Sequence, residues 1–283
     1  MVSEDIEKLP VIDVILLFPE VNKSLIDLLS GLKEEDWNKS TVLPGRKVKD
    51  LVSHILDSSL RRLSTCRDNY QVDSPDIRSY EDLVKYIQKL NKIGMEFYGR
   101  LSPTVLISLL KESETWLYEY FKTLKLDVKA KLPVAWAGEE ESLNWFDIAR
   151  EYTEKWHHQM QIRLAVNKVA VINSRKLFYP VIDIFMRGLP HAYRHVKAAN
   201  NTEIEFEIKG NGGGTWFLEN FNNKWRLAAK LKKKSDAKIV MSDDIAWRIF
   251  ADSIDYNEAA KEVDIYGNKD LGVPILKMKC VMR

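Results

Sequence analysis

Cysteine is scarce in this sequence, with only Cys66 and Cys280 among its 283 residues. Two cysteines so far apart cannot build the disulfide framework of a small secreted protein, and they form no closely spaced pair of the kind that binds zinc. Neither has a histidine close to it in the sequence, so we predict that neither is a reactive nucleophile. The low cysteine content is typical of a reducing compartment, and we expect a cytoplasmic protein.

A long apolar run is also missing, because no uninterrupted stretch approaches the roughly 20 residues that a membrane-spanning helix needs. The first residues carry Glu4, Asp5 and Glu7, where a secretory signal peptide would carry positive charge. We therefore expect neither a membrane partner nor a cleaved leader.

An excess of charge of one sign is absent as well. The 43 Lys and Arg residues face 41 Asp and Glu residues, which leaves a formal net charge of +2. Such a balance produces no strong long-range field that would favour nucleic acid or an anionic membrane. Internal repeats and low-complexity segments are not found either. We expect no nucleic-acid partner, and a monomer or a homodimer.

Hydrophobic residues make up 45% of the chain, and their spacing changes along it. Up to about Ala170 they recur with the period of a helix, and from about Thr202 they form short alternating runs with glycine and asparagine turns. The expected fold is α plus α+β, with a helical domain at 1–172 and a smaller α+β domain with its linking helix at 173–283. Helices are predicted at 14–29, 48–66, 79–100, 103–124, 145–167 and 177–196, and strands at 203–209, 215–219, 225–231, 237–241 and 263–266.

Two of these helices carry apolar stripes that predict which way they face. The stripe of the helix at 145–167 consists of Ile148, Tyr152 and Trp156, and we expect it to serve the core. The stripe of the helix at 79–100 consists of Leu83, Tyr86, Ile87, Leu90 and Ile93, and we expect it to face inward as well.

A candidate metal site begins in the helix at 145–167. Glu154 and His158 lie four residues apart, so their side chains stand one above the other on one helical face, away from the apolar stripe. His157 is three residues from Glu154 and is an alternative to His158. Carboxylate and imidazole ligands suit zinc, and also iron or nickel.

A third ligand has to come from another helix, and His54 lies beside an apolar face in the helix at 48–66. Helical bundles commonly build metal sites from facing helices. Asp50, one turn earlier, could orient the imidazole of His54 or could be a surface carboxylate. From the residues alone, a hydrogen-bonded core histidine and a chance Glu–His pair remain competing interpretations.

Three stretches of the sequence match a pattern known from one protein family. In residues 13–57 the matching positions are Trp37, Thr41, Pro44, Gly45, Val48, Asp50, Leu51 and His54. In the second stretch they are Glu154, His158, Gln161, Ile162 and Arg163. The third, weaker stretch comprises GGGTW at 212–216, the helix around Trp247 and residues 263–282. Together they resemble the mycothiol-dependent maleylpyruvate isomerases, whose metal-binding domain belongs to the DinB-like superfamily.

The resemblance implies a DinB-like four-helix bundle followed by a sterol-carrier-protein-like α+β domain. It implies that His54, Glu154 and His158 bind a divalent metal, and it selects His158 over His157. Zinc is the first expectation, with nickel or iron as alternatives. The metal would activate a low-molecular-weight thiol, the co-substrate, for addition to a small electrophile, as in a cis–trans isomerase or a thiol S-transferase. Gln161 and Arg163 could contact an acidic thiol or substrate.

The sequence departs from the family pattern near its end. The isomerases are expected to carry a basic residue there, commonly an arginine after a glycine, whereas Gly267 is followed here by Asn268 and Lys269. The chain is also rich in Lys, Asn and Ile rather than Ala and Arg, unlike proteins of the organisms that make mycothiol. Maleylpyruvate as the substrate and mycothiol as the thiol are therefore both open.

Two other functions compete with thiol chemistry. In the first, the metal is structural and the C-terminal domain of a non-catalytic protein binds an apolar ligand. In the second, the same metal site activates water in a hydrolase. A closed shell of four protein ligands would favour the structural role, and three ligands with an open position would favour catalysis.

Overall fold

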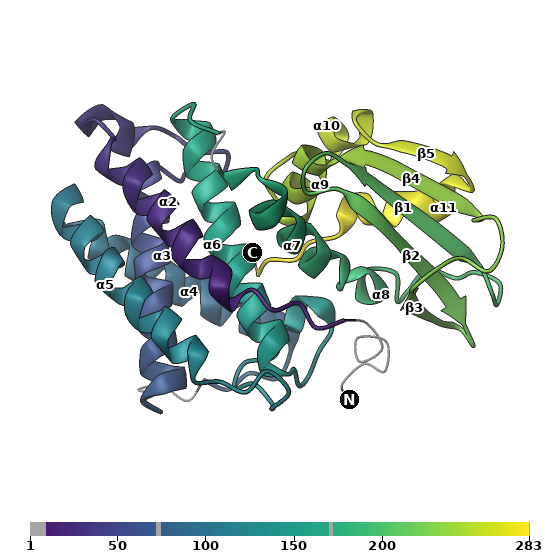
Figure 1. Ribbon diagram of the computed structural model, residues 1–283, viewed down its shortest axis with the longest axis horizontal. Helices are drawn as coiled ribbons and strands as arrows, with labels where there is room; N and C mark the ends of the chain where they lie inside the picture. The colour runs from purple at the N-terminus through teal and green to yellow at the C-terminus, as the bar shows by residue number, and fades with distance from the viewer. Residues whose placement is uncertain (1–9, 72–74, 170–171, 283) are drawn as a thin grey trace.

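The computed structural model describes residues 10–71, 75–169 and 172–282. A helical N-terminal region is followed by a sheet with helices, as the sequence predicted (Figure 1). The acidic residues Glu4, Asp5 and Glu7, on which the expectation about a leader rests, lie outside the described residues. No helix in the described ranges is both long and apolar enough to cross a membrane.

The described part of the helical region contains five α-helices, of which four form a closed ring of contacts. Helix α2 contacts α5 and α6, and α3 contacts the same two helices from the other side. Helix α4 packs on α3. The bounds are α2 Phe18–Ser30, α3 Val48–Arg62, α4 Tyr80–Tyr98, α5 Pro103–Lys122 and α6 Asn144–Ala165.

Local chemistry explains where these helices begin. Ser79 and Ser102 accept hydrogen bonds from the backbone N–H groups three residues later, and so cap α4 and α5. Pro103 occupies the first turn of α5, where its missing N–H costs nothing. At α3, the Asp50 carboxylate accepts from the backbone N–H of Lys47. These contacts satisfy donors that the first turn of a helix leaves without partners.

The inward-facing stripe predicted for α4 is wrong in part. Only Gly94 and Met95 of this helix are buried, and Ile93 is 52% exposed. Gly94 lies at a close approach of α4 to α3, because a Cβ atom there would come within 2.2 Å of the Asp57 side chain. The other four stripe residues, Leu83, Tyr86, Ile87 and Leu90, are half-buried and line a cavity beside α3.

The C-terminal region is built on a five-stranded mixed sheet of order β3-β2-β1-β4-β5. The central strands β1 and β4 are parallel, and the other neighbours are antiparallel. The strands are β1 Glu203–Lys209, β2 Gly214–Phe221, β3 Lys224–Ala228, β4 Ala237–Ser242 and β5 Asp264–Gly267. The helices are α7 Arg175–Met186, α8 Leu189–Ala192, α9 Asp243–Phe250, α10 Tyr256–Lys261 and α11 Lys269–Gly272.

One hydrophobic core runs from the bundle into the sheet region. Trp156 of α6 stacks on Phe178 of α7 at a ring-centroid distance of 4.4 Å and meets Trp247 of α9 at 5.8 Å. Its indole N–H donates to the carbonyl of Ile172. The stripe of Ile148, Tyr152 and Trp156 is therefore in the core as predicted, but this core is shared with the C-terminal region, and α7 lies between α6 and the sheet in Figure 1. A domain boundary at residue 172 stays a prediction.

Candidate metal centre

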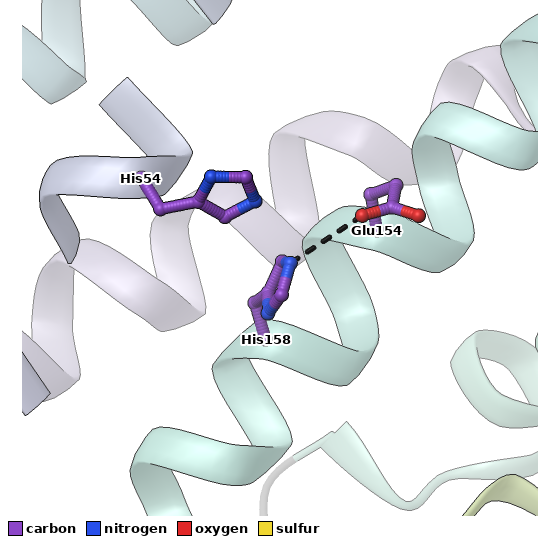
Figure 2. A group of neighbouring side chains, drawn as sticks. All are labelled: His54, Glu154 and His158. Atoms are coloured by element: carbon purple, nitrogen blue, oxygen red, sulfur yellow. Dashed lines mark ion pairs between the residues drawn. The ribbon is translucent and has the colours of Figure 1, made fainter. Parts of the chain in front are cut away.

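The structure brings His54, Glu154 and His158 together between α3 and α6. One donor atom from each residue lies within 4.8 Å of the other two. His158 Nε2 is 3.3 Å from Glu154 Oε2, and the rings of His54 and His158 meet nearly edge to face at 4.7 Å. Figure 2 shows the two imidazoles and the carboxylate converging on a common space. Residues 100 positions apart in the sequence thus meet as the prediction required.

A hydrogen-bond chain from the C-terminal region fixes the orientation of His158. Its Nδ1 atom is 2.8 Å from Gln161 Oε1, and Gln161 Nε2 donates to Ser253 Oγ at 2.9 Å. An amide oxygen accepts, so Nδ1 is the donor in this contact, and Nε2 is the ring nitrogen on the side of Glu154. Gln161 is therefore a positioning residue for His158, a role that its place on α6 did not reveal.

His157 is held in a different way. Its Nδ1 atom donates to the carbonyl of Thr153, one turn earlier, at 2.8 Å. Its Nε2 atom lies 3.9 Å from Glu154 Oε2, farther than the 3.3 Å found for His158. His157 is not part of the three-residue donor group in the described chain.

The suggestion that Asp50 orients His54 is wrong. The Asp50 carboxylate caps the start of α3 through Lys47, and Nδ1 of His54 is buried without any hydrogen-bond partner among the described residues. A buried imidazole nitrogen normally has a partner. No side chain of the described residues therefore orients the ring of His54 through this nitrogen.

The protonation states of the site suit metal binding. Burial, and then the charge of His158, hold the pKa of His54 well below its ordinary value. Burial by itself would raise the pKa of Glu154, but interactions with His157 and His158 lower it below the usual range. Burial also lowers the pKa of His157 to about 3. At neutral pH, His54 is a neutral imidazole and Glu154 a carboxylate, the forms that coordinate cations.

The donor set fits a divalent cation. Two imidazole nitrogens and a carboxylate oxygen converge on one point, which is the donor set of zinc sites and of open iron sites. Nothing in the arrangement selects one metal among zinc, nickel and iron.

The three side chains open onto a cavity of about 490 Å³. The half-buried stripe of α4 forms an apolar wall, and α3 and α6 form a polar wall. The C-terminal region contributes Ala251, Val281 and Met282. Gln88 of α4 donates to the carbonyl of Met282 at 2.6 Å, so the two regions of the chain close the cavity together.

A network of buried charges lies next to the site, on the same two helices and α5. Arg62 donates to both oxygens of Asp147, at 2.5 and 3.2 Å, and lies 3.4 Å from Glu151. Arg150 also pairs with Asp147, at 2.8 Å. One turn on, Lys155 donates to Ser59 at 2.5 Å and to Glu114 at 2.7 Å. None of these positions was singled out from the sequence.

Other predicted contacts lie elsewhere. Arg163 does not face the cavity: it is buried and donates to the Ser24 hydroxyl and carbonyl and to the Lys168 carbonyl. Lys269 is exposed and is not among the residues that line the cavity. Cys66 and Cys280 are free and buried, and burial raises the pKa of both thiols, which agrees with the prediction that neither is reactive.

Comparison with known proteins gives two findings. The family model described as the mycothiol maleylpyruvate isomerase N-terminal domain matches residues 18–163. Two crystal structures, of the mycothiol-dependent maleylpyruvate isomerase and of its variant with a histidine changed to alanine, share the fold at TM-scores of 0.54 and 0.53. Each is 10% identical in sequence, over 92% of this chain and 94% of the other. No curated protein matches at a significant level.

Proposed function

We propose, from the premise that this chain belongs to the mycothiol maleylpyruvate isomerase N-terminal domain family, that it is a metal-dependent enzyme of thiol chemistry. In this proposal His54, Glu154 and His158 hold a divalent cation, zinc in the first place and nickel or iron as alternatives. The co-substrate is a low-molecular-weight thiol, and the activity is that of a cis–trans isomerase or a thiol S-transferase. The observation that carries it is the convergence of three donor atoms within 4.8 Å at the wall of a 490 Å³ cavity.

The number of ligands supports a catalytic role over a structural one. Three residues of the described chain form the donor group, and His157, the nearest further candidate, is tied to Thr153. Structural zinc sites are closed by four protein ligands, whereas catalytic sites keep a position for water or substrate. The cavity beside the donor group supplies the space for that substrate.

When bound, a divalent cation lowers the pKa of a coordinating thiol, so that the sulfur is present as the nucleophilic thiolate. The chain's own residues prepare the site for this. Gln161 fixes the ring of His158, and Glu154 contributes a negative charge. The apolar wall formed by α4 lowers the polarity on one side of the cavity, which strengthens the electrostatic interactions there.

In an isomerase, the proposed reaction regenerates the thiol at the end of each cycle. The thiolate forms a C–S bond to one carbon of a conjugated double bond, and the π electrons move onto the carbonyl group in conjugation with it. Rotation then occurs about the new single bond. The electron pair returns, the double bond re-forms in the trans arrangement and the C–S bond breaks. In a transferase the C–S bond persists and the neighbouring carbon takes up a proton.

Elemental analysis of the purified protein tests the metal site. We expect about one divalent metal ion per chain in the parent protein, little or none in His54→Ala, and parent-like content in His157→Asn. The His157 variant is the matched control, because it removes a neighbouring imidazole outside the donor group. Circular dichroism establishes that each variant is folded. Equal metal content in the parent and His54→Ala would contradict the proposal.

Activity assays then separate thiol chemistry from the alternatives. The metal-loaded protein should consume an α,β-unsaturated carbonyl compound, or convert its cis form to trans, only when a low-molecular-weight thiol is present. Hydrolysis of an ester or amide without added thiol would identify a hydrolase instead. A loaded protein that performs neither reaction would favour a structural metal. The two reduced cysteines fit a cytoplasmic location for this chemistry.

A further inference from the structure

The arginines that line the cavity differ in whether their charges are already neutralised. Among the described residues, four arginines lie there: Arg46, Arg61, Arg62 and Arg150. Arg61 donates to Asp57 and Asn91, each at 2.7 Å. Arg62 and Arg150 share the carboxylates of Asp147 and Glu151. The guanidinium of Arg46 has no hydrogen bond or ion pair with any described residue.

The backbone of Arg46 is held firmly although its side chain is not. Its N–H donates to the carbonyl of Leu43, and its own carbonyl accepts from both the N–H and the hydroxyl of Thr41. Gly45 precedes it with φ of +71°, a conformation that favours glycine. Arg46 is half-buried. The turn therefore fixes the starting point of a cationic side chain at the cavity wall.

Arg46 lies in the turn before α3, so its backbone stands at the N-terminal end of the part of the cavity lining that α3 provides. It precedes the first residue of α3, Val48, and His54 follows six residues into that helix. At 1.5 Å per residue this segment of helix alone spans about 9 Å. The neighbouring lining residues at this end, Leu43, Pro44 and Leu51, are apolar. The planar guanidinium of an unpaired arginine can donate two parallel hydrogen bonds to a carboxylate, which suits it to bind an anionic group.

The two acidic residues that line the cavity in the described part of the chain are both engaged elsewhere and do not pair with Arg46. Glu151 pairs with Arg62, Arg150 and Lys155, and Glu154 belongs to the donor group. The cavity thus combines a cation-binding point in its polar wall with an unpaired positive charge at one end. A molecule that occupies both places has a metal-binding atom and a separate anionic group.

We infer that Arg46 is a specificity-determining residue that binds an anionic group, such as a carboxylate, on the tail of the thiol co-substrate. This inference rests on the proposed function. An electrophile has its reacting carbon in bonding contact with the sulfur, so its activating group stays at the metal end. A charge at the Arg46 end is remote from the sulfur and belongs on the tail of the thiol.

Thiol binding to the cobalt(II)-loaded protein tests the inference without an activity assay, because thiolate coordination to cobalt produces a charge-transfer absorption. The probes are 6-mercaptohexanoate, which is anionic, and 6-mercaptohexanol, which is neutral and of similar length. The proteins are the parent, Arg46→Gln, Arg46→Lys and Arg100→Gln. Arg100 is an exposed arginine that does not line the cavity, and its variant is the matched control.

We expect the parent and Arg100→Gln to bind the anionic thiol about tenfold to a hundredfold more tightly than the neutral one. Arg46→Gln should lose this preference while its affinity for 6-mercaptohexanol is unchanged, and Arg46→Lys should recover part of it. Equal affinities of the parent for the two thiols, or a preference that survives in Arg46→Gln, would overturn the inference and leave the proposed function standing. An absence of thiolate absorption with either thiol would instead overturn the proposed function.

A second titration identifies the source of the anionic group. Maleate carries carboxylates but no sulfur, and its binding is measured by calorimetry. If Arg46→Gln weakens maleate binding but leaves 6-mercaptohexanoate binding unchanged, Arg46 binds an anionic group of the electrophile. Its assignment to the thiol tail would then be wrong. If only the binding of the thiol acid weakens, the assignment is supported.

Discussion

Two polar clusters lie side by side between α3 and α6, and they differ in what completes them. In the charge network, each buried cation faces a carboxylate: Arg62 faces Asp147, and Lys155 faces Glu114. In the donor group, two imidazoles and a carboxylate converge with no cation among them. In the network the protein supplies both the positive and the negative charges, whereas the donor atoms of the other cluster face one another without a cation. The same pair of helices therefore carries a structural cluster and a candidate functional one.

The pKa shifts show the same contrast. Burial would lower the pKa of Arg62, but Asp147 and Glu151 raise it, so the guanidinium is held in its charged form. Burial lowers the pKa of His54 as well, but there it is the dominant effect, so the imidazole is held in its neutral form. A neutral imidazole with a free lone pair can coordinate a metal ion, and a paired guanidinium cannot.

The largest expected effect comes from breaking the network. Arg62→Met removes one partner of a buried ion pair and leaves Asp147 and Glu151 with less compensation, so we expect the free energy of unfolding to fall by about 3–5 kcal/mol. Urea denaturation of the metal-free protein measures it. The folded fraction should still bind metal as the parent does, since Arg62 is not in the donor group.

A double variant checks the cause of that loss. Adding Asp147→Asn to Arg62→Met removes the uncompensated carboxylate and should restore part of the lost stability. The two losses in the free energy of unfolding, for Arg62→Met and for Asp147→Asn alone, could instead add up in the double variant. The two residues would then contribute independently, and the network would not be cooperative.

A smaller effect is expected at the contact that orients His158. Gln161→Leu removes the acceptor of the Nδ1 proton, and metal affinity should fall about tenfold to a hundredfold, as for other residues that orient metal-bound imidazoles. Competition with a chelator of known affinity measures it. Gln159→Leu is the matched control, since this buried glutamine of α6 bonds to Ser24 and does not line the cavity. Equal losses in both variants would mean that the effect is one of packing.

The mildest perturbation is a fall in pH, which should release the metal ion from the donor group before it disrupts the ion pairs of the network. Because the folded-state pKa of His54 is depressed, its neutral form persists below the ordinary value of 6.5 and is lost as the pH falls further. Burial alone would raise the pKa of Asp147, but Arg62 and Arg150 hold it below 3.8. Its stabilising charge is therefore present above 3.8 and is lost as the pH falls through the folded-state value.

We thus expect metal release at a higher pH than unfolding. A metal-sensitive dye follows the first event, and tryptophan fluorescence follows the second. Coincident transitions would show that the metal ion and the fold depend on each other across the whole acid range, and the two clusters would then not be separable.

Sequence reasoning succeeded where the signal is local or periodic. Strand β1 was predicted at its observed bounds, Glu203–Lys209, because a period of two and flanking turns suffice. The Glu154–His158 pair follows from helical spacing alone. The choice of His54 as a partner came from family resemblance, since spacing does not show which distant helix faces α6.

Sequence reasoning failed where a residue's role depends on tertiary contacts. The apolar stripe of α4 has the pattern of a core helix, but Gly94 sets the approach to α3 and leaves Leu83 and Ile87 as a cavity wall. Arg62 and Asp147 are 85 residues apart, and each resembles a surface charge when read singly. Gln161 and His158 have the spacing of ordinary helix neighbours. That Gln161 orients the His158 ring becomes clear only from its second hydrogen bond, to the distant Ser253.

The burial of Cys66 and Cys280 has a consequence for any chemistry in this cavity. A protein that handles thiols and electrophiles risks modification of its own sulfur atoms, either by mixed disulfide formation or by alkylation. Here both thiols are enclosed, and their raised pKa values keep them protonated at neutral pH. We therefore expect the two cysteines of the folded chain to react slowly with its proposed reactants.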